Sequence, residues 1–254
     1  MTARPRLSSR IRARLTGRAP GPAQVDVRRF DPDVQETIAA VRPFTMTSPE
    51  RIDAVCAAAA HVARHQVPGA VVECGVWLGG SAMAAALTLC RHGVVDRDLY
   101  LFDTFAGMPA PDDASDVITA TGESAMAVWQ RENARGGPPW LAAPVEQVRA
   151  NMATTGYPMA RVHLVEGLVE DTIPSAAPAQ IALLRLDTDW YASTKLEMEQ
   201  LWPRLVPGGI LIVDDYGHLD GARRAVDEYL AEIGVPMFLH RIDYTGRIGV
   251  KPAG

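Results

Sequence analysis

The chain of 254 residues has few cysteines, few aromatic side chains and no long hydrophobic run. Its three cysteines, at positions 56, 74 and 90, form no CxxC pair and have no histidine at metal-site spacing. That pattern excludes a disulfide framework and a zinc finger, and it favours a reducing, cytoplasmic location. No apolar stretch approaches the roughly 18 residues of a membrane span, so we expect no membrane partner. A chain of this length can build a core without a disulfide or a structural metal.

Lysine is also scarce: the chain has 2 lysines and 23 arginines, and its formal net charge is −5. Eight of the arginines lie in residues 1–29, beside one acid, Asp26. The remaining residues are strongly acidic, which argues against nucleic acid as a partner. We predict a basic, flexible tail over residues 1–29, with a short helix packed on a partner subunit as the alternative. Residues 30–254 should form a single domain.

Short apolar segments alternate with helical patterns along this domain. Several of these segments are apolar on both faces, as strands of a parallel sheet covered by helices are. The segment 243–246 reads as a hairpin turn, so one strand near the C-terminus should be antiparallel. The pattern predicts an α/β fold with a doubly wound, mostly parallel sheet. The expected strands are 70–76, 98–104, 162–167, 181–187, 209–215, 237–242 and 247–251; the expected helices are 30–64, 81–91, 194–205 and 222–233.

One connection is much longer than the others. Residues 105–161 show no strand signal and contain several prolines, glycines and acids, whereas connections in compact α/β folds are usually 2–6 residues long. Ligands in such folds bind outside the carboxyl ends of the strands. We therefore interpret 105–161 as a lid or substrate-binding insertion, with a surface excursion without function as the alternative.

The first strand ends in a glycine-rich turn, residues 73–81 (ECGVWLGGS). A dinucleotide fold would need a glycine where this chain has Trp77, which argues against NAD. Asp103 follows at the end of the next strand and could accept hydrogen bonds from a ribose. Glu73 could bind a ligand ammonium group or orient the loop. A nucleoside bearing an amino acid, S-adenosylmethionine, fits these features, and a merely structural turn is the alternative.

Acidic side chains follow two other strands. Asp187 and Asp189 come after one strand, and Asp214 and Asp215 come after the next. The carboxyl ends of neighbouring parallel strands open into one crevice, and alternation along an extended segment would place Asp187 and Asp189 on one side. Clustered carboxylates need a cation, and oxygen ligands select Mg²⁺, with Ca²⁺ or Mn²⁺ as alternatives. The competing interpretation is a helix cap at Asp215 and ion pairs of Asp189 with Arg185 or Lys195.

A divalent metal beside S-adenosylmethionine has a chemical use. The cation lowers the pKa of an acceptor hydroxyl, and a carboxylate outside the metal shell can take the proton. This combination predicts an O-methyltransferase that acts on a sugar or a catechol. A metal-dependent hydrolase is less favoured, because no lysine follows Gly80 as it would in a phosphate-binding loop.

Six segments in order, ECGVWLGGS, LFDTFAGMP, GLVEDTIP, LRLDTDWYAST, PGGILIVDDYG and GARRAVDEY, resemble the macrocin O-methyltransferase family. The resemblance covers residues 44 to about 232. It implies a class I methyltransferase fold, S-adenosylmethionine as the donor, Mg²⁺ as the metal, a glycosylated antibiotic as the acceptor and a homodimer. The substrate is then a small-molecule glycoside.

The resemblance also assigns residues to the site. Metal ligation is implied for Asp187, Asp214 and Asp215, and the role of general base for Asp189. Implied cofactor contacts are Thr45, Met46, Glu73, Gly75, Val76, Trp77, Gly79, Gly80, Ser81, Asp103, Thr104, Phe105, Gly167 and Leu168. Four further residues are candidate acceptor contacts from their positions near the acids: Trp190, Tyr191, Tyr216 and His218. Packing beneath the site is the alternative for the aromatic residues, and His218 is also a rival base.

Overall fold

The computed structural model describes residues 25–111 and 116–253. Most of the predicted basic tail, residues 1–24, lies outside the described residues. The described chain begins with a short helical turn and the helices α2 (Pro32–Val41) and α3 (Pro49–Arg64). Residues 45–48 between them are not helical, and the Ser48 hydroxyl accepts a hydrogen bond from the amide of Arg51 and so caps α3. The helical pattern over 30–64 is therefore two helices.

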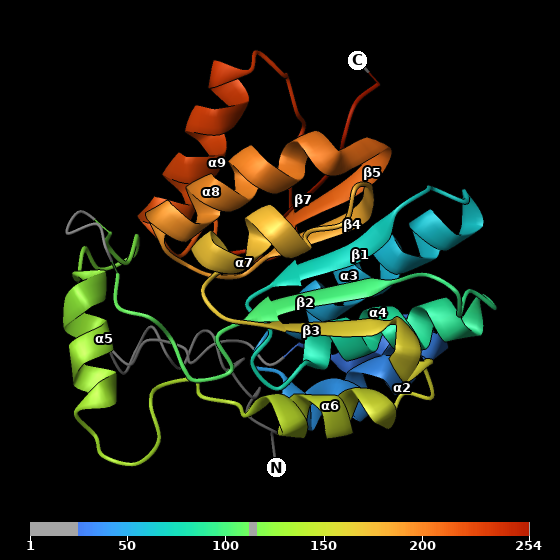
Figure 1. The fold of residues 1–254 in the computed structure, drawn as a ribbon, viewed down its shortest axis with the longest axis horizontal. Helices are drawn as coiled ribbons and strands as arrows, with labels where there is room; N and C mark the ends of the chain where they lie inside the picture. Colours follow the sequence, from blue (N-terminus) through green and yellow to red (C-terminus); the bar gives the residue numbers. More distant parts are fainter. Residues whose placement is uncertain (1–24, 112–115, 254) are drawn as a thin grey trace, which may run out of the picture.

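A seven-stranded sheet in the order β3-β2-β1-β4-β5-β7-β6 forms the centre of the molecule (Figure 1). Its first five strands, in sheet order, are parallel, and β7 runs antiparallel to β5. This confirms the mostly parallel sheet with an antiparallel strand near the C-terminus, the architecture of a class I methyltransferase. The strands are β1 (Ala70–Cys74), β2 (Leu99–Asp103), β3 (Val162–Glu166), β4 (Ile181–Leu186), β5 (Leu205–Val213), β6 (His240–Arg241) and β7 (Arg247–Val250).

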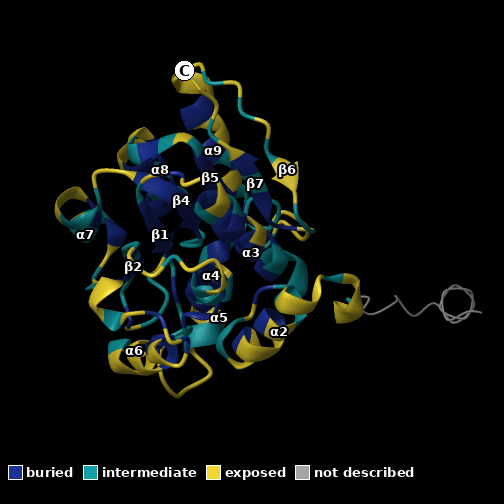
Figure 2. Ribbon diagram, turned by 90° about the vertical axis from the view of Figure 1, so that its right-hand side faces the viewer, coloured by how far each residue is buried: buried dark blue, intermediate teal, exposed yellow. Residues whose placement is uncertain are grey.

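Helices cover both faces of the sheet. One layer contains α2, α3, α4 (Gly80–Arg91) and α6 (Val145–Ala153), and the other contains α7 (Val169–Ala176), α8 (Tyr191–Leu201) and α9 (Asp220–Glu232). Side chains alternate between the two faces: Val71 packs with the first layer and Val72 with the second. All five residues of β1 and all six of β4 are buried, as Figure 2 shows at the centre of the molecule. Burial on both faces explains why these strands read as continuous apolar runs.

Two further elements differ from the sequence expectation. The segment 237–242 forms only a two-residue strand, because just His240 and Arg241 pair with β7. Helix α7 was not predicted, because it is short and contains Pro174. A proline near the end of a helix reads from sequence as a stop signal.

The long connection after β2 contains two helices with different positions. Helix α5 (Ala125–Asn133) stands away from the sheet, whereas α6 lies under α4 (Figure 1). Val148 and Met152 of α6 are fully buried in the core of that layer. Among the described residues of 105–161, those before α6 therefore extend over the carboxyl ends of the strands.

Candidate active site

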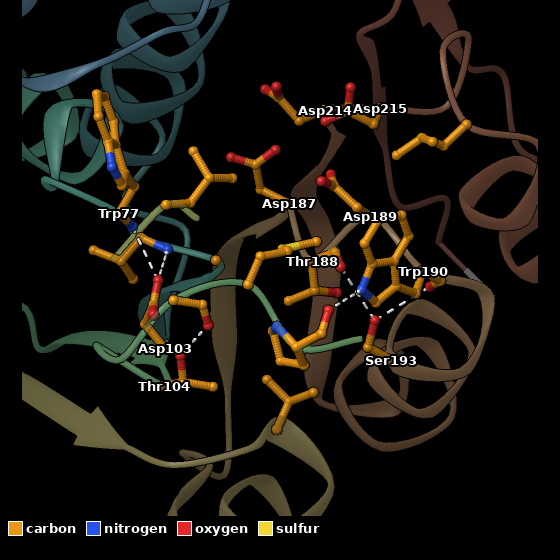
Figure 3. Close-up of a pocket in the computed structure, with 18 of the residues that line it drawn as sticks. Trp77, Asp103, Thr104, Asp187, Thr188, Asp189, Trp190, Ser193, Asp214 and Asp215 are labelled. Atoms are coloured by element: carbon orange, nitrogen blue, oxygen red, sulfur yellow. Dashed lines mark hydrogen bonds between the residues drawn. The ribbon is translucent and has the colours of Figure 1, made fainter. Parts of the chain in front are cut away.

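A cavity of about 520 Å³ opens at the carboxyl ends of β1, β2, β4 and β5. This volume lies within the range of small-molecule sites, roughly 300–1,000 Å³. Figure 3 shows two groups of side chains in it: Asp103 on one side, and Asp187, Asp189, Asp214 and Asp215 on the other. The cavity therefore joins the glycine-rich turn to the acidic cluster, as the sequence pattern predicts.

Asp103 holds the glycine-rich turn in place. Its Oδ2 accepts the backbone N–H groups of Val76 at 2.7 Å and Trp77 at 2.9 Å, and its Oδ1 accepts that of Phe105 at 2.7 Å. Trp77 has φ of 47°, an unusual conformation for a non-glycine residue, and its hydrogen bond to Asp103 helps to hold it there. A carboxylate has about four acceptor positions, so Asp103 keeps capacity for about one more donor.

The glycines of this turn serve the protein's own packing. A side chain on Gly75 would lie 2.0 Å from the carbonyl oxygen of Asp187, and one on Gly80 would lie 2.6 Å from that of Phe44. Gly75 also has φ of 81°. Glycine is therefore required where β1 meets β4 and where α4 meets the segment before α3. These close approaches bring the turn, Thr45 and Asp187 to one cavity.

Asp187, Asp214 and Asp215 form a compact group of carboxylates. One oxygen from each lies within 4.8 Å of the others. Asp214 is almost fully buried, and Asp187 and Asp215 are half-buried. Oxygen-only groups of this kind suit a hard divalent cation.

Two arginines form ion pairs with these carboxylates. Arg185, buried in β4, donates to Glu73 at 2.5 Å and Asp214 at 2.7 Å, and its Nη2 lies 2.8 Å from Asp187. Arg51, in the first turn of α3, pairs with the other oxygen of Asp214. The sequence allowed an ion pair of Asp189 with Arg185 or Lys195. Arg185 instead pairs with Asp187 and Asp214, and Lys195 pairs with Glu199 and Glu232.

The arginines leave the cluster with excess negative charge. The pKa values of Asp187 and Asp189 are raised well above the ordinary range, first by burial and then by neighbouring carboxylates, an effect that Arg185 opposes at Asp187. At Asp189, the neighbouring carboxylate of Asp215 adds to the effect of burial and raises the pKa further. A divalent cation would relieve this repulsion and keep the carboxylates ionised.

The loop after β4 brings Asp187 and Asp189 together with a backbone conformation that differs from the expected extended one. The strand ends at Leu186, so the extended alternation assumed from sequence does not apply. Asp189 instead has a left-handed backbone with φ of 72°. The loop is held by the Trp190 amide, which donates to the Thr188 carbonyl at 2.9 Å, and by the Ser193 hydroxyl, which donates to the Trp190 carbonyl at 3.2 Å.

The segment after β2 closes one side of the cavity with apolar side chains. Met108, Pro109 and Trp140 line the cavity together with Leu219, and Met108 and Trp140 share an apolar cluster with Leu219. The Trp190 indole N–H donates to the Pro109 carbonyl at 3.0 Å. The segment that lines the acceptor side is thereby tied to the loop that carries Asp189.

Most of the predicted site residues line this one cavity. They are Thr45, Met46, Gly75, Val76, Trp77, Gly80, Ser81, Asp103, Thr104, Gly167, Leu168, Asp187, Asp189, Trp190, Asp214, Asp215 and His218.

Five predicted residues are not among those that line the cavity. Glu73 is buried beneath it on Arg185, and Gly79 and Phe105 shape the adjoining turns. Tyr191 donates its hydroxyl to Glu228 and Tyr216 donates its own to Asp227, both at 2.6 Å. The Tyr191 and Tyr216 side chains are thus engaged on α9.

Sequence reasoning missed Arg51, Asp243 and Glu197. Asp243 pairs with Arg51 at 3.1 Å, a contact between segments almost two hundred residues apart. A cation in the first turn of a helix is disfavoured by the helix dipole, which was the one available signal for Arg51. Glu197 falls on a core position of α8, fully buried, and an acid on an apolar helix face was the signal there.

Comparison with known proteins agrees with this geometry. The family model described as Macrocin-O-methyltransferase (TylF) matches residues 18–248, a wider span than the motifs cover. A Streptomyces olivaceus protein described as 8-demethyl-8-(2,3-dimethoxy-alpha-L-rhamnosyl)-tetracenomycin-C 4'-O-methyltransferase is 37% identical over 202 residues, 80% of this chain and 73% of that protein. Demethyldecarbamoylnovobiocin O-methyltransferase of Streptomyces niveus is 34% identical, with the same coverage of each chain.

Solved structures give the same result. The O-methyltransferase NovP superposes with a TM-score of 0.71 at 30% identity, covering 83% of each chain. The calicheamicin methyltransferase CalS11 has a TM-score of 0.60 at 22% identity, covering 91% of this chain and 99% of its own, which supports the fold. No helix among the described residues is long and apolar enough to cross a membrane. Taken with the site geometry, these matches show that the chain belongs to the macrocin O-methyltransferase family and is an S-adenosylmethionine-dependent O-methyltransferase.

Proposed function

We propose that this enzyme methylates a sugar hydroxyl of a glycosylated natural product and that it requires Mg²⁺. The observation that carries the proposal is the placement of Asp187, Asp189, Asp214 and Asp215 in one cavity with the glycine-rich turn. The relatives' descriptions support the acceptor class, because they name a rhamnosyl tetracenomycin and a novobiocin precursor.

The residues present fit a divalent cation. Asp187, Asp214 and Asp215 offer closely spaced oxygens. The pKa of Asp187 is raised by burial and then by neighbouring carboxylates, whose repulsion a cation would relieve. In this proposal the three carboxylates hold Mg²⁺. When bound, the ion supplies polarisation of the acceptor hydroxyl, lowering its pKa.

The donor would occupy the side of the cavity formed by the glycine-rich turn. Asp103 has remaining acceptor capacity for a ribose hydroxyl, and Thr45, Met46, Gly167 and Leu168 line the same side. S-adenosylmethionine supplies an electrophilic methyl group on its sulfonium. Fixing donor and acceptor in one cavity replaces a collision of free molecules with a pre-oriented encounter.

Asp189 is our candidate for the general base. It lines the cavity beside the three proposed ligands. Arg185 forms ion pairs with Asp187 and Asp214, and Arg51 forms one with Asp214. Asp189 feels the charge of Arg51, which lowers its pKa, without an ion pair to either arginine. Its carboxylate can therefore take the acceptor hydroxyl proton as the methyl group transfers.

The apolar wall formed by Met108, Pro109, Trp140 and Leu219 faces the acceptor side. Trp190 and His218 also line this part of the cavity and are the proposed sugar contacts. Residues 105–111 and 116–141 accordingly act as the substrate-binding insertion. An apolar wall beside polar, acidic groups suits a sugar joined to a hydrophobic aglycone.

Incubation with S-adenosylmethionine and a rhamnosylated acceptor or demethyldecarbamoylnovobiocin, followed by mass spectrometry, tests the proposal. We expect one methyl group on the sugar in the presence of Mg²⁺ and none with EDTA. Methylation of a catechol but of no glycoside would contradict it. The homodimer implied by the family is part of the proposal, and light scattering should give the mass of two chains.

A further inference from the structure

Glu197 is a fully buried acid beneath the active-site loop. It lies on the core side of α8, with Met198 and Leu201 buried on the same helix. Burying a carboxyl among apolar side chains is costly unless the group has a specific partner. None of the groups that shift its pKa is a cation. The position therefore calls for an explanation other than an ion pair.

The partner of Glu197 is the loop that carries the predicted metal ligand and base. The Thr188 hydroxyl donates to Glu197 Oε1 at 2.9 Å, and Thr188 stands between Asp187 and Asp189. The Cys74 thiol, at the end of β1, lies near the same carboxyl and lowers its pKa. Glu197 thus connects α8 to the carboxyl ends of two strands at the cavity floor.

We propose that Glu197 is a positioning residue that fixes the Asp187–Thr188–Asp189 loop through the Thr188 hydroxyl. Asp189 has a left-handed backbone, a conformation that the surroundings must hold in place. Backbone contacts hold Asp187, whose amide donates to the Cys74 carbonyl at 2.9 Å. The Thr188–Glu197 bond adds a side-chain anchor between the two acids.

Groups outside a metal's ligand shell that orient its ligands typically change metal affinity about 10–100-fold when removed. The inference rests on the proposed metal site, so the experiment combines a metal-dependent and a metal-independent measurement. The variants are T188V, which removes the donor and keeps the shape, E197M, which removes the acceptor, and E197Q, which keeps an acceptor oxygen. L201A, one turn along α8, is the control for lost stability.

Calorimetry with Mg²⁺ on chelator-treated protein measures metal affinity. We expect T188V and E197M each to weaken Mg²⁺ binding about tenfold. E197Q and L201A should stay within about threefold, and the T188V/E197M double variant should be no weaker than either single variant, because both remove one interaction. Equal losses in E197Q and E197M, or in L201A and E197M, would overturn the proposal.

Hydrogen exchange of the peptide spanning 187–190 measures the loop without any metal. Exchange should be faster in T188V and E197M and near wild type in E197Q and L201A. Wild-type exchange in T188V would refute the anchoring role whatever the metal does. Absence of Mg²⁺ binding in the wild-type protein would instead refute the proposed metal site. The exchange measurement would still test the anchoring role of Glu197, because it needs no metal.

Discussion

Replacing Asp189 with asparagine separates removal of the acceptor proton from metal binding. The change keeps the shape of the side chain and removes its capacity to take a proton. Since the proposed metal ligands are Asp187, Asp214 and Asp215, the D189N variant should retain Mg²⁺ and the donor. We expect kcat to fall by about 10²–10⁴, the contribution of a positioned base. The remaining rate should rise with pH, because the polarised hydroxyl ionises more readily in alkali.

The same change should stabilise the metal-free protein. Asp189 lies against Asp215, and its raised pKa reports burial and repulsion from neighbouring acids. Two like charges 4 Å apart cost about 4 kcal/mol at an effective dielectric of 20, which is an upper bound because proton uptake relieves part of it. We expect D189N to raise the free energy of unfolding by about 1–2 kcal/mol. The gain should shrink in saturating Mg²⁺, since the cation relieves the same repulsion in the wild type.

Steady-state kinetics, Mg²⁺ calorimetry and thermal unfolding with and without the metal test these expectations together. D171N is a matched control, because Asp171 is exposed on α7 and should show wild-type values in all three. Loss of Mg²⁺ binding in D189N would make Asp189 a ligand and His218 the leading base. A kcat within about threefold of wild type would show that solvent takes the proton.

Three further predictions follow from the contacts around the cavity. Replacing Asp103 with alanine should weaken binding of S-adenosylhomocysteine by about 1.5–3 kcal/mol through lost charged hydrogen bonds, with Mg²⁺ affinity unchanged; equal donor affinity by calorimetry would remove Asp103 from the site. Replacing Arg185 with methionine should destabilise the fold by about 3–5 kcal/mol in urea titrations, because buried acids lose their partner; a loss below about 1 kcal/mol would contradict the buried network. Burial raises the pKa of Glu197 to about 8 from 4.5, so the folded state keeps a proton that the unfolded chain releases, and stability falls with rising pH between these values by at most about 1.4 kcal/mol per unit. E197Q should flatten that slope, and an unchanged slope would show that Glu197 is ionised in the fold.

The sheet could be predicted from sequence because its determinants are local. Strands buried on both faces read as apolar runs, and the glycine-rich turn marks where β1 ends. The position of the acids after β4 and β5 followed from topology, since neighbouring parallel strands end at one edge. That reasoning placed Asp187 and Asp214 in one cavity correctly.

The features of the site that the sequence did not predict depend on contacts between segments far apart in the sequence. Arg51 reaches Asp214 across 163 positions, and no local pattern encodes that pairing. Tyr191 and Tyr216 lie beside the site in sequence, yet each donates its hydroxyl to an acid of α9. The left-handed backbone of Asp189 has no sequence signature, since non-glycine residues rarely adopt it. The glycines at 75 and 80 were expected as cofactor contacts, but close packing of the protein's own backbone also requires them.

Methyl transfer to a glycoside, measured with and without Mg²⁺, tests the central claim most directly. Purified enzyme, S-adenosylmethionine and a rhamnosylated aromatic polyketide should give a product that gains one methyl group, located on the sugar by fragmentation. Activity should disappear in EDTA, return with Mg²⁺, and be absent from a D214N variant that still binds the donor. Full turnover in chelator with protein shown to be metal-free, or methylation only on the aglycone, would contradict the account.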